Sequence, residues 1–480
     1  MQELSQNSIM SESEPFQCIL YVFDSLRYDW LGCNGNEKNL TPTMDSIADD
    51  GINFDQAYSQ AIWTYPSSAS IFSGLYPESH GSQQFDEVLG SELPHLADGF
   101  SETDVDTVCF STTLGVSPER GFKQGFDEFY HIGENDSGLR PDIMDILNEQ
   151  LLTWIDQHSN TDFFAVVWAM GTHHPYLTPE DVENPSKPLI NVPEIQATQA
   201  SMRKKSRDEV SEIHSYYDSV VNYSDGALNE LVELLKSNGI YENTSMIVTS
   251  DHGEVFSEHA RLENSSQLTQ SIFKRIFGSS RCRYYGLFDE SAFIGHQGIH
   301  PYEELIHVPL IIKPSSDLNV GERTKVEYEE IVELIDILPT IYDAAGLDVP
   351  ELTQGTSIFK LLDGVEDKKY SYSCSQIHNG NLVYRSIYDG EHKLLKWDLE
   401  SVALNEFLNP RVIQSTLAYL IGDSPVTFSN GMKTDFNHNH DDLLQILSKH
   451  ISQCREIDSD TEDYSVDDET INHLENLGYK

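Results

Sequence analysis

The sequence predicts an α/β sandwich with a mostly parallel central sheet flanked by helices, followed by a small antiparallel subdomain near the C-terminus. Three observations predict this fold class. Short apolar runs recur in the chain before about residue 365, the last at residues 308–312, and are typical of strands buried on both faces of a sheet. Amphipathic helical patterns lie between the runs, and this alternation favours a parallel sheet. Beyond that point, short strands around a tight turn indicate an antiparallel unit.

Five apolar runs are the expected strands. They cover residues 18–23, 105–110, 163–170, 246–248 and 308–312. The first four end abruptly in polar residues, with Asp24 directly after the first run and Asp251 shortly after the fourth. Because ligands of α/β folds collect at the carboxyl ends of the strands, we expect a binding site among these polar residues.

Two helices are clearly marked. A Thr-Pro pair at residues 41–42 supplies an N-cap and a first helical position, and an apolar stripe follows over residues 44–48. Residues 216–237 carry apolar side chains at helical spacing and end at an Asn-Gly stop at residues 238–239. Both patterns predict helices that pack on the sheet.

The predicted organisation has four parts. They are a polar segment at residues 1–16, the main α/β domain at 17–365, a small α+β subdomain at 366–455, and an acidic tail with a short terminal helix at 456–480. The subdomain is predicted from a hairpin, in which residues 382–388 and 392–397 flank an Asp-Gly turn.

The composition is strongly acidic. Of 480 residues, 79 are Asp or Glu and 30 are Lys or Arg, which gives a formal net charge of −49. Hydrophobic residues make up 39%, enough for a large core, so a wholly disordered chain is excluded. Such a charge repels a phosphate backbone, and no nucleic-acid partner is expected. Because salt screens self-repulsion, the charge indicates adaptation to a salt-rich cytoplasm; an ordinary acidic protein is the alternative.

Positive charge is concentrated in two stretches, residues 203–207 and 274–283. These stretches either attract an anionic substrate to the site or balance neighbouring acidic residues, and the sequence leaves both interpretations open.

The sequence shows no export signal and no membrane-spanning run. Residues 1–16 lack the basic start and the apolar stretch of a signal peptide, and no apolar run reaches the length of a bilayer. The six cysteines are scattered without paired short spacing, which is typical of reduced thiols. We therefore expect a cytoplasmic protein with no membrane span, and the sequence leaves its oligomeric state open.

Asp24, Asp251 and His252 are candidate metal ligands. They follow two of the predicted strands and supply two carboxylates and one imidazole. Hard oxygen donors favour Ca²⁺, Mg²⁺ or Mn²⁺, and histidine also admits Zn²⁺. An Asp after a strand is more often a cap or turn residue, but an adjacent Asp-His directly after a buried strand is a less generic pattern.

Thr64 is a candidate nucleophile. It precedes Pro66, which is expected at the first position of a helix rich in small residues, so that free backbone N–H groups point toward whatever lies before it. Without a metal, a hydroxyl there is an N-cap. Beside a divalent cation, its pKa falls and the helix dipole favours the alkoxide and an incoming tetrahedral anion.

Taken in order, a series of segments resembles the sulfatases of the alkaline phosphatase superfamily. The segments are residues 23–32, 54–59, 64–68 (Thr-Tyr-Pro-Ser-Ser), 73–81, 125–129 (Gly-Phe-Asp-Glu-Phe), 173–176 (His-His-Pro-Tyr), 249–254 (Thr-Ser-Asp-His-Gly-Glu), 295–298 (Gly-His-Gln-Gly), 302–310, 336–340 (Asp-Ile-Leu-Pro-Thr) and 477–479. The match spans roughly residues 17–400, and so many ordered motifs rarely arise by accident. The resemblance implies an alkaline-phosphatase-like sandwich.

The resemblance further implies a metal-dependent hydrolase of sulfate or phosphate-type esters. One divalent cation, with Ca²⁺ favoured and Mg²⁺, Mn²⁺ or Zn²⁺ as alternatives, would be held by Asp24, Asp251 and His252. Thr64 would contact the metal as the nucleophile and form a covalent sulfo- or phospho-threonine that water then cleaves.

The substrate implied by the resemblance is a small anionic ester of a sugar, a lipid or an aryl alcohol, sulfated or phosphorylated. His173 would contact the bound anion or the leaving oxygen. His296 would do likewise, as a candidate general acid, and Ser67 is a further candidate for substrate binding.

Three positions depart from the pattern of well-known sulfatases. Those enzymes oxidise a Cys or Ser to formylglycine, but Thr64 cannot become that aldehyde, so no formylglycine is expected. Ser68 stands where the nucleophile loop carries Arg, and Ser25 stands where the family has a second aspartate. A phosphotransferase of the phosphoglycerol or sugar-phosphate type, and a catalytically silent member that only binds metal or anion, are the alternatives.

Overall fold

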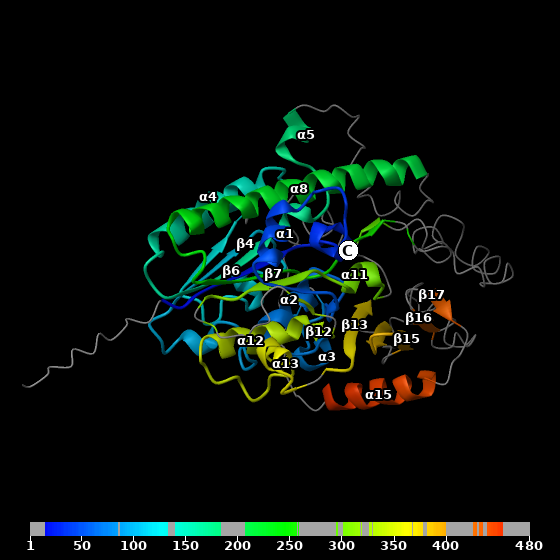
Figure 1. The fold of residues 1–480 in the computed structure, drawn as a ribbon. Helices are drawn as coiled ribbons and strands as arrows, with labels where there is room; N and C mark the ends of the chain where they lie inside the picture. The colour runs from blue at the N-terminus through cyan, green and yellow to red at the C-terminus, as the bar shows by residue number, and fades with distance from the viewer. Residues whose placement is uncertain are drawn as a thin grey trace, which may run out of the picture.

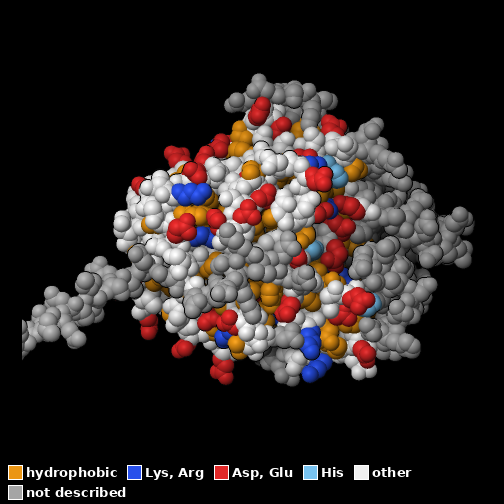
Figure 2. Space-filling model, viewed as in Figure 1, with side chains coloured by type: hydrophobic (Ala, Val, Ile, Leu, Met, Phe, Trp, Pro, Cys, Tyr) orange, Lys and Arg blue, Asp and Glu red, His pale blue; other side chains and the backbone are white. Residues whose placement is uncertain are grey.

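The computed structural model confirms the predicted fold class (Figure 1). The residues that the structure describes are 15–84, 87–132, 140–183, 207–256, 258, 294–295, 301–316, 318, 326–328, 330–366, 368–377, 382–399, 426–429, 432–434 and 439–454. Within this part of the chain, none of the helices combines the length and the apolar character that a membrane crossing requires. Acidic side chains are spread over the visible face with few basic ones between them (Figure 2).

The central sheet has eight strands in the order β11-β2-β10-β7-β1-β6-β4-β5. Their bounds are β1 (Gln17–Phe23), β2 (Ile52–Phe54), β4 (Asp106–Ser111), β5 (Glu128–His131), β6 (Phe163–Ala169), β7 (Thr244–Ser250), β10 (Leu310–Lys313) and β11 (Val326–Tyr328). Strand β10 runs antiparallel to both of its neighbours, whereas the other neighbouring pairs are parallel. The sheet is therefore mostly parallel, as predicted.

Helices cover both faces of this sheet (Figure 1). One face carries α1 (Pro42–Asp49), α4 (Ile143–Gln157) and α8 (Arg207–Ser237), and the other carries α2 (Thr64–Ser73), α12 (Ile337–Ala344) and α13 (Ile358–Leu362). Helix α8 begins at Arg207, nine residues before the predicted start at residue 216.

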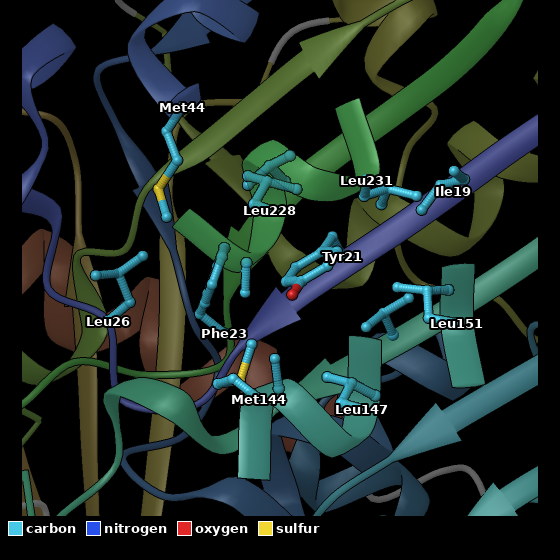
Figure 3. Packing of buried hydrophobic residues seen from close by; sticks show 14 of the residues in the cluster. Ile19, Tyr21, Phe23, Leu26, Met44, Met144, Leu147, Leu151, Leu228 and Leu231 are labelled. Atoms are coloured by element: carbon cyan, nitrogen blue, oxygen red, sulfur yellow. The ribbon is translucent and has the colours of Figure 1, made fainter. Parts of the chain in front are cut away.

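Strand β1 shows why its sequence is a continuous apolar run. All seven of its residues are buried, and successive side chains point to opposite faces of the sheet. Tyr21 and Phe23 belong to the core under α4 and α8 (Figure 3), whereas Leu20 and Val22 belong to the core under α2 and α12. Each such side chain contributes roughly 1.5–3 kcal/mol on burial.

Shorter elements connect these layers. They are η1 (Tyr28–Trp30), η2 (Gly32–Asn34), β3 (Ala57–Tyr58), α3 (Pro77–His80), η3 (Asp98–Phe100), η4 (Pro118–Arg120), η5 (Met170–Thr172), α5 (Pro179–Glu183), β8 (Val255–Phe256), β9 (Ile294–Gly295), α11 (Glu303–Ile306), β12 (Val332–Glu333) and η8 (Leu334–Asp336).

The C-terminal part of the described chain is a five-stranded antiparallel sheet covered by one helix. Its elements are β13 (Ser371–Ile377), β14 (Leu382–Tyr388), β15 (His392–Leu399), β16 (Val426–Ser429), β17 (Met432–Thr434) and α15 (Asn439–Cys454). Leu443 and Leu447 of α15 pack on Ile387 and Leu394. The boundary near residue 365 stays a prediction, and the expected acidic tail lies outside the described residues.

The predicted hairpin is confirmed. Strands β14 and β15 pair antiparallel, and the turn between them contains Gly390 at φ 89°, in the left-handed region that favours glycine. The carboxylate of Asp389 accepts hydrogen bonds from the backbone N–H groups of Glu391 (3.0 Å) and His392 (2.6 Å), which stabilises the turn.

Candidate active site

Two aspartates meet because their strands are neighbours. Strand β1 lies between β6 and β7 in parallel register, so that Phe23 aligns with Ala169 on one side and with Ser250 on the other. Asp24 and Asp251 are the next residues along β1 and β7, and both are fully buried. The expected cluster at the carboxyl edge of the sheet is therefore present.

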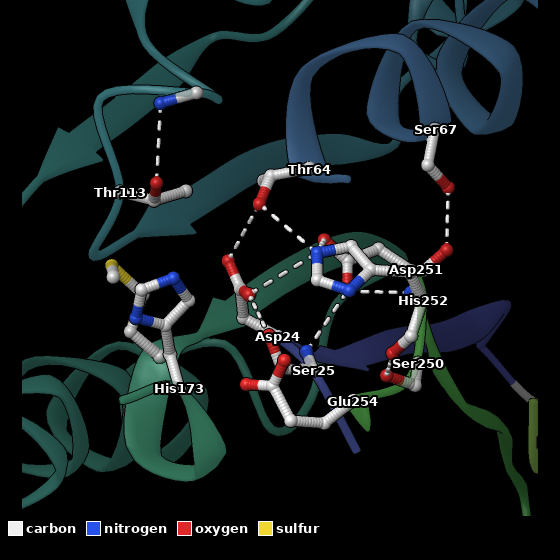
Figure 4. A network of polar contacts seen from close by, with 12 residues as sticks. Asp24, Ser25, Thr64, Ser67, Thr113, His173, Ser250, Asp251, His252 and Glu254 are labelled. Atoms are coloured by element: carbon white, nitrogen blue, oxygen red, sulfur yellow. Dashed lines mark hydrogen bonds and ion pairs between the residues drawn. The ribbon is translucent and has the colours of Figure 1, made fainter. Parts of the chain in front are cut away.

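The ligand atoms of Asp24, Asp251 and His252 all lie within 4.8 Å of one another (Figure 4). The Nδ1 atom of His252 lies 2.8 Å from the carbonyl oxygen of Gly253, and a carbonyl can only accept, so Nδ1 carries the proton. Nε2 therefore presents a lone pair, 3.7 Å from Asp24 Oδ1 and 3.6 Å from Asp251 Oδ2. Three acceptors converge on one point.

This donor set fits a cation. Burial, and then the charge of Asp24, raise the pKa of Asp251 well above its ordinary value. Among the described residues, Asp251 Oδ2 is a buried atom with no hydrogen-bond partner. An orphaned carboxylate oxygen facing a second carboxylate and an imidazole lone pair is the arrangement that a divalent metal ion satisfies.

Ser25 holds both carboxylates in place. Its backbone N–H donates to Asp251 Oδ1 at 3.1 Å, and its hydroxyl donates to Asp24 Oδ1 at 2.9 Å. The residue adopts φ 66°, a left-handed conformation that is uncommon outside glycine. The residue that lacks the family's second carboxylate thus orients the two carboxylates that remain.

Thr64 joins this cluster at the start of α2. Its hydroxyl donates to Asp24 Oδ2 at 3.2 Å and lies 3.4 Å from His252 Nε2. Trp63, in an extended conformation, is the N-cap, and Pro66 is the third helical residue. The expectation of Pro66 at the first position is therefore wrong. Proline is tolerated there because the N–H groups of the first helical turn have no partner within the helix.

His173 lies across the site from Thr64 (Figure 4). It follows η5, at the end of β6, and its Nδ1 donates to the carbonyl of His174 at 2.6 Å. The residue is 3% exposed, and a positive charge on its ring would lower the pKa of the Glu254 carboxyl.

Glu254 is a site residue that sequence reasoning did not single out. Its carboxylate is fully buried beside the acidic cluster, and Oε2 accepts a hydrogen bond from Tyr176 at 2.6 Å. Burial raises the pKa of Glu254 to about 7, although the bond from Tyr176 opposes this shift. The only signal in the sequence was its place directly after the Asp-His-Gly segment.

Ser67 and His296 are the other two residues expected in the site, and their predicted roles stay predictions. The Ser67 hydroxyl donates to the backbone carbonyl of Asp251 at 2.6 Å, so it ties α2 to β7, and its role in substrate binding stays a prediction. His296 lies outside the described residues, as do the basic stretches at 203–206 and 274–283.

Comparisons with known proteins identify the family of this chain. A model of the sulfatase family matches residues 17–347. The arylsulfatase of Clostridium perfringens is 25% identical over 448 residues, covering 78% of this chain and 81% of the relative. The Delta 4,5-hexuronate-2-O-sulfatase of Bacteroides thetaiotaomicron is 23% identical, with 74% of each chain covered.

A solved structure shows the same fold. The phosphonate monoester hydrolase from Silicibacter pomeroyi superposes with a TM-score of 0.66 over 93% of this chain and 96% of that chain, at 17% identity. At this identity the likeness shows the fold alone. The family model, by contrast, covers well over half of the chain. This match shows that the protein belongs to the sulfatase family of ester hydrolases.

Proposed function

We propose that this chain hydrolyses sulfate or phosphate-type esters with one divalent cation and with Thr64 as the nucleophile. The observation that carries the proposal is the position of the Thr64 hydroxyl, 3.2 Å from Asp24 Oδ2 and 3.4 Å from His252 Nε2. A hydroxyl within reach of two metal-ligand candidates, at the N-terminus of a ten-residue helix, is suited to attack a tetrahedral anion.

Asp24, Asp251 and His252 would hold the cation, for which we favour Ca²⁺ because two of the three donors are carboxylates. When bound, the cation lowers the pKa of the Thr64 hydroxyl and stabilises negative charge on the reacting group. The protein fixes this geometry beforehand, since Ser25 holds one oxygen of each aspartate.

In the first step, Thr64 Oγ1 forms a bond to the sulfur or phosphorus of the ester, and the bond from that atom to the leaving oxygen breaks. The proton of Thr64 moves along its hydrogen bond to Asp24 Oδ2. The leaving oxygen takes a proton from an imidazole, and His173 is the one that faces this space (Figure 4). His296 keeps its predicted role as a second histidine.

In the second step, water attacks the sulfur or phosphorus of the covalent intermediate. The water gives one proton to the imidazole, and the Thr64 oxygen leaves and takes back its proton from Asp24. Inorganic sulfate, or the phosphorus oxyanion, is released, and both side chains return to their starting state.

Thr64 also bears on the kind of ester. Oxidation of a threonine side chain gives a ketone, because its Cβ carries a methyl group, so we propose that the enzyme works without formylglycine. A threonine that attacks directly favours phosphate-type over sulfate esters. The relatives include proteins named as sugar sulfatases, so we propose sugar esters as the first substrates to examine.

The test is Thr64→Ala, assayed on 4-nitrophenyl sulfate, 4-nitrophenyl phosphate and bis(4-nitrophenyl) phosphate in molar KCl with Ca²⁺. We expect kcat to fall by about 10³-fold or more, since removal of a nucleophile leaves only binding and electrostatic effects. Thr153→Ala, the same substitution at an exposed position of α4, is the matched control and should keep full activity.

Three results would decide against the proposal. Full turnover in Thr64→Ala would exclude the nucleophile. Ca²⁺ binding in calorimetry without turnover of any ester would support a silent binding protein. Product diverted to an added sugar or glycerol acceptor would support a transferase, because a hydrolase ignores the acceptor. Mass spectrometry of acid-quenched protein should find the sulfo- or phospho-group on the Thr64 peptide.

A further inference from the structure

The loop that follows β4 approaches Thr64 closely at Gly115. A Cβ atom placed on Gly115 would lie 3.0 Å from Cγ2 of Thr64 and 3.4 Å from Cβ of Thr64. The φ angle of Gly115 is outside the left-handed region, so its backbone conformation does not require glycine. The close approach to Thr64 favours glycine, because a Cβ atom at position 115 would press on the threonine methyl group and one of the two would have to shift by a few tenths of an ångström.

Hydrogen bonds and a buried side chain hold this loop in place, so that it cannot easily move away from Thr64. The backbone N–H and the hydroxyl of Thr112 both donate to the carbonyl of Trp168 on β6, at 3.1 and 3.0 Å. The N–H of Gly115 donates to Thr113 Oγ1 at 3.1 Å (Figure 4), and the next residue, Val116, is fully buried in the core. A side chain at position 115 would therefore displace Thr64 more readily than it would displace the loop.

The methyl and hydroxyl groups of Thr64 are both substituents of its Cβ atom. The methyl group faces Gly115, and the hydroxyl faces Asp24 and His252. Rotation about χ1 moves both groups together, and a β-branched side chain has few allowed rotamers. Fixing the methyl group therefore fixes the hydroxyl.

We propose that Gly115 is a positioning residue that locks the rotamer of Thr64, so that its hydroxyl stays on the metal-ligand cluster. The inference rests on the proposed role of Thr64 as nucleophile. It also gives a reason for threonine at this position: a serine would carry the same hydroxyl but would have no methyl group for the loop to hold.

The experiment is a double-mutant cycle of Gly115→Ala and Thr64→Ser. We expect Gly115→Ala to lower kcat by about 10- to 100-fold, because a nucleophile displaced by a fraction of an ångström loses alignment. Thr64→Ser should lower kcat by roughly 3- to 10-fold, because the hydroxyl gains other staggered positions. The double variant should stay within about threefold of Thr64→Ser, since the methyl that met the new Cβ is gone.

Two further measurements separate positioning from general damage. Ca²⁺ affinity in calorimetry should fall much less than kcat in all three variants, because each of them keeps Asp24, Asp251 and His252. Gly226→Ala is the matched control, since a Cβ there meets nothing within 4 Å, and it should keep full activity.

The outcomes distinguish the lock from the nucleophile. An active Thr64→Ala would overturn the proposed function. An inactive Thr64→Ala together with a fully active Gly115→Ala would overturn the lock alone, as would a double variant whose losses simply multiply. If Gly115→Ala does not fold, the single variant Thr64→Ser, which keeps Gly115, is the test. An unchanged kcat in this variant would overturn the proposed role of Gly115.

Discussion

Two buried acidic clusters in this protein are neutralised in different ways. In the first, the Lys368 ammonium donates to Glu333 Oε2 at 2.8 Å and to both carboxylate oxygens of Asp336 at 2.7 and 2.8 Å. In the second, Asp24 and Asp251 face each other across the site, and within the described residues no lysine or arginine forms an ion pair with either of them.

The lysine cluster is also fully hydrogen-bonded. Glu333 accepts from the Tyr76 hydroxyl at 2.7 Å and from Gln60 Nε2 at 3.2 Å. Burial alone would lower the pKa of Lys368, but Asp336 and Glu333 outweigh it and raise that pKa. The Lys368 ammonium is the cation of this cluster. The cluster also anchors the segment before Thr64, because Gln60, which donates to Glu333, lies four residues before Thr64.

The two clusters therefore differ in the role that they can serve. A carboxylate pair with a resident lysine needs nothing from solution and serves the fold. For the carboxylate pair with an orphaned oxygen, Asp251 Oδ2, we propose that a cation from solution supplies the missing partner.

Lys368→Met should destabilise the protein by about 3–5 kcal/mol, because it leaves Glu333 and Asp336 buried without their counter-charge. The loss should be the same with Ca²⁺ and with a chelator, since this cluster binds no ion. Urea unfolding in molar KCl measures it. Lys369→Met, at the exposed neighbouring position, should change stability by no more than about 0.5 kcal/mol. A loss in Lys368→Met as small as that of the control would contradict the comparison.

Asp251→Asn should have the opposite dependence on metal. The parent gains about 2.7 kcal/mol of stability at a free Ca²⁺ concentration one hundred times the Kd, and the variant should lose this gain. With a chelator, the variant should be no less stable than the parent, because the substitution removes a charge that burial and Asp24 disfavour. Thermal unfolding with and without Ca²⁺ tests both statements.

The exposed Asp348→Asn is the control for Asp251→Asn and should respond to Ca²⁺ as the parent does. If Asp251→Asn kept the full Ca²⁺ stabilisation, the acidic pair at the strand ends would not be the metal site.

His95 is a third kind of buried polar group, a histidine that has neither a counter-charge nor a hydrogen-bond partner among the described residues. Its ring is buried against Phe72 and Phe126, and neither ring nitrogen has a hydrogen-bond partner among the described residues. Burial lowers the pKa of His95 to about 3. Below about pH 6.5 the unfolded chain therefore binds a proton at this histidine, whereas the folded protein does not until the pH approaches about 3. Stability therefore falls as the pH falls.

His95→Phe removes that contribution. Between pH 7 and pH 5 the variant should lose about 2 kcal/mol less than the parent, and at pH 7 it should be at least as stable. His80 is the control: burial also lowers its pKa to about 3, but its ring nitrogens contact the Ser70 hydroxyl at 3.1 Å and the Ser82 N–H at 3.0 Å. His80→Phe should therefore destabilise at pH 7. Equal behaviour of the two variants would refute the distinction.

The sequence predicted those parts of the fold that are set by local pattern. The long buried strands β1, β6 and β7 have continuous apolar runs, and the C-terminal hairpin has its Asp-Gly turn. The short strands β2, β5 and β11 were missed, because three or four residues carry no periodicity of their own and pair only when the neighbouring strand is present.

The candidate site divides in the same way. Asp24, Asp251, His252 and Thr64 could be named from their places after strands and before a helix, and from the family resemblance. The close approach of Gly115 could not, since it arises from packing between the loop after β4 and a helix some fifty residues earlier. Contacts of this kind depend on backbone paths that no local pattern encodes.

Ser25 combines both cases. Its identity predicted one carboxylate fewer than the family has, but only the structure shows that it binds both remaining carboxylates from a left-handed conformation. Asp and Asn tolerate this conformation better than most residues, so both can be placed there with little strain. Ser25→Asp should raise Ca²⁺ affinity by about tenfold, equivalent to about 1.4 kcal/mol, by adding a negatively charged oxygen ligand.

With a chelator, Ser25→Asp should be less stable than the parent, because a third carboxylate then joins an uncompensated pair. Ser25→Asn is the matched control, with the same shape and a neutral carbonyl oxygen, and it should gain less Ca²⁺ affinity than Ser25→Asp and none of the instability. Calorimetry and thermal unfolding measure the two effects. If the two variants bound Ca²⁺ equally, the charge of the cluster would not govern metal binding, and the contrast with the lysine-neutralised cluster would lose its meaning.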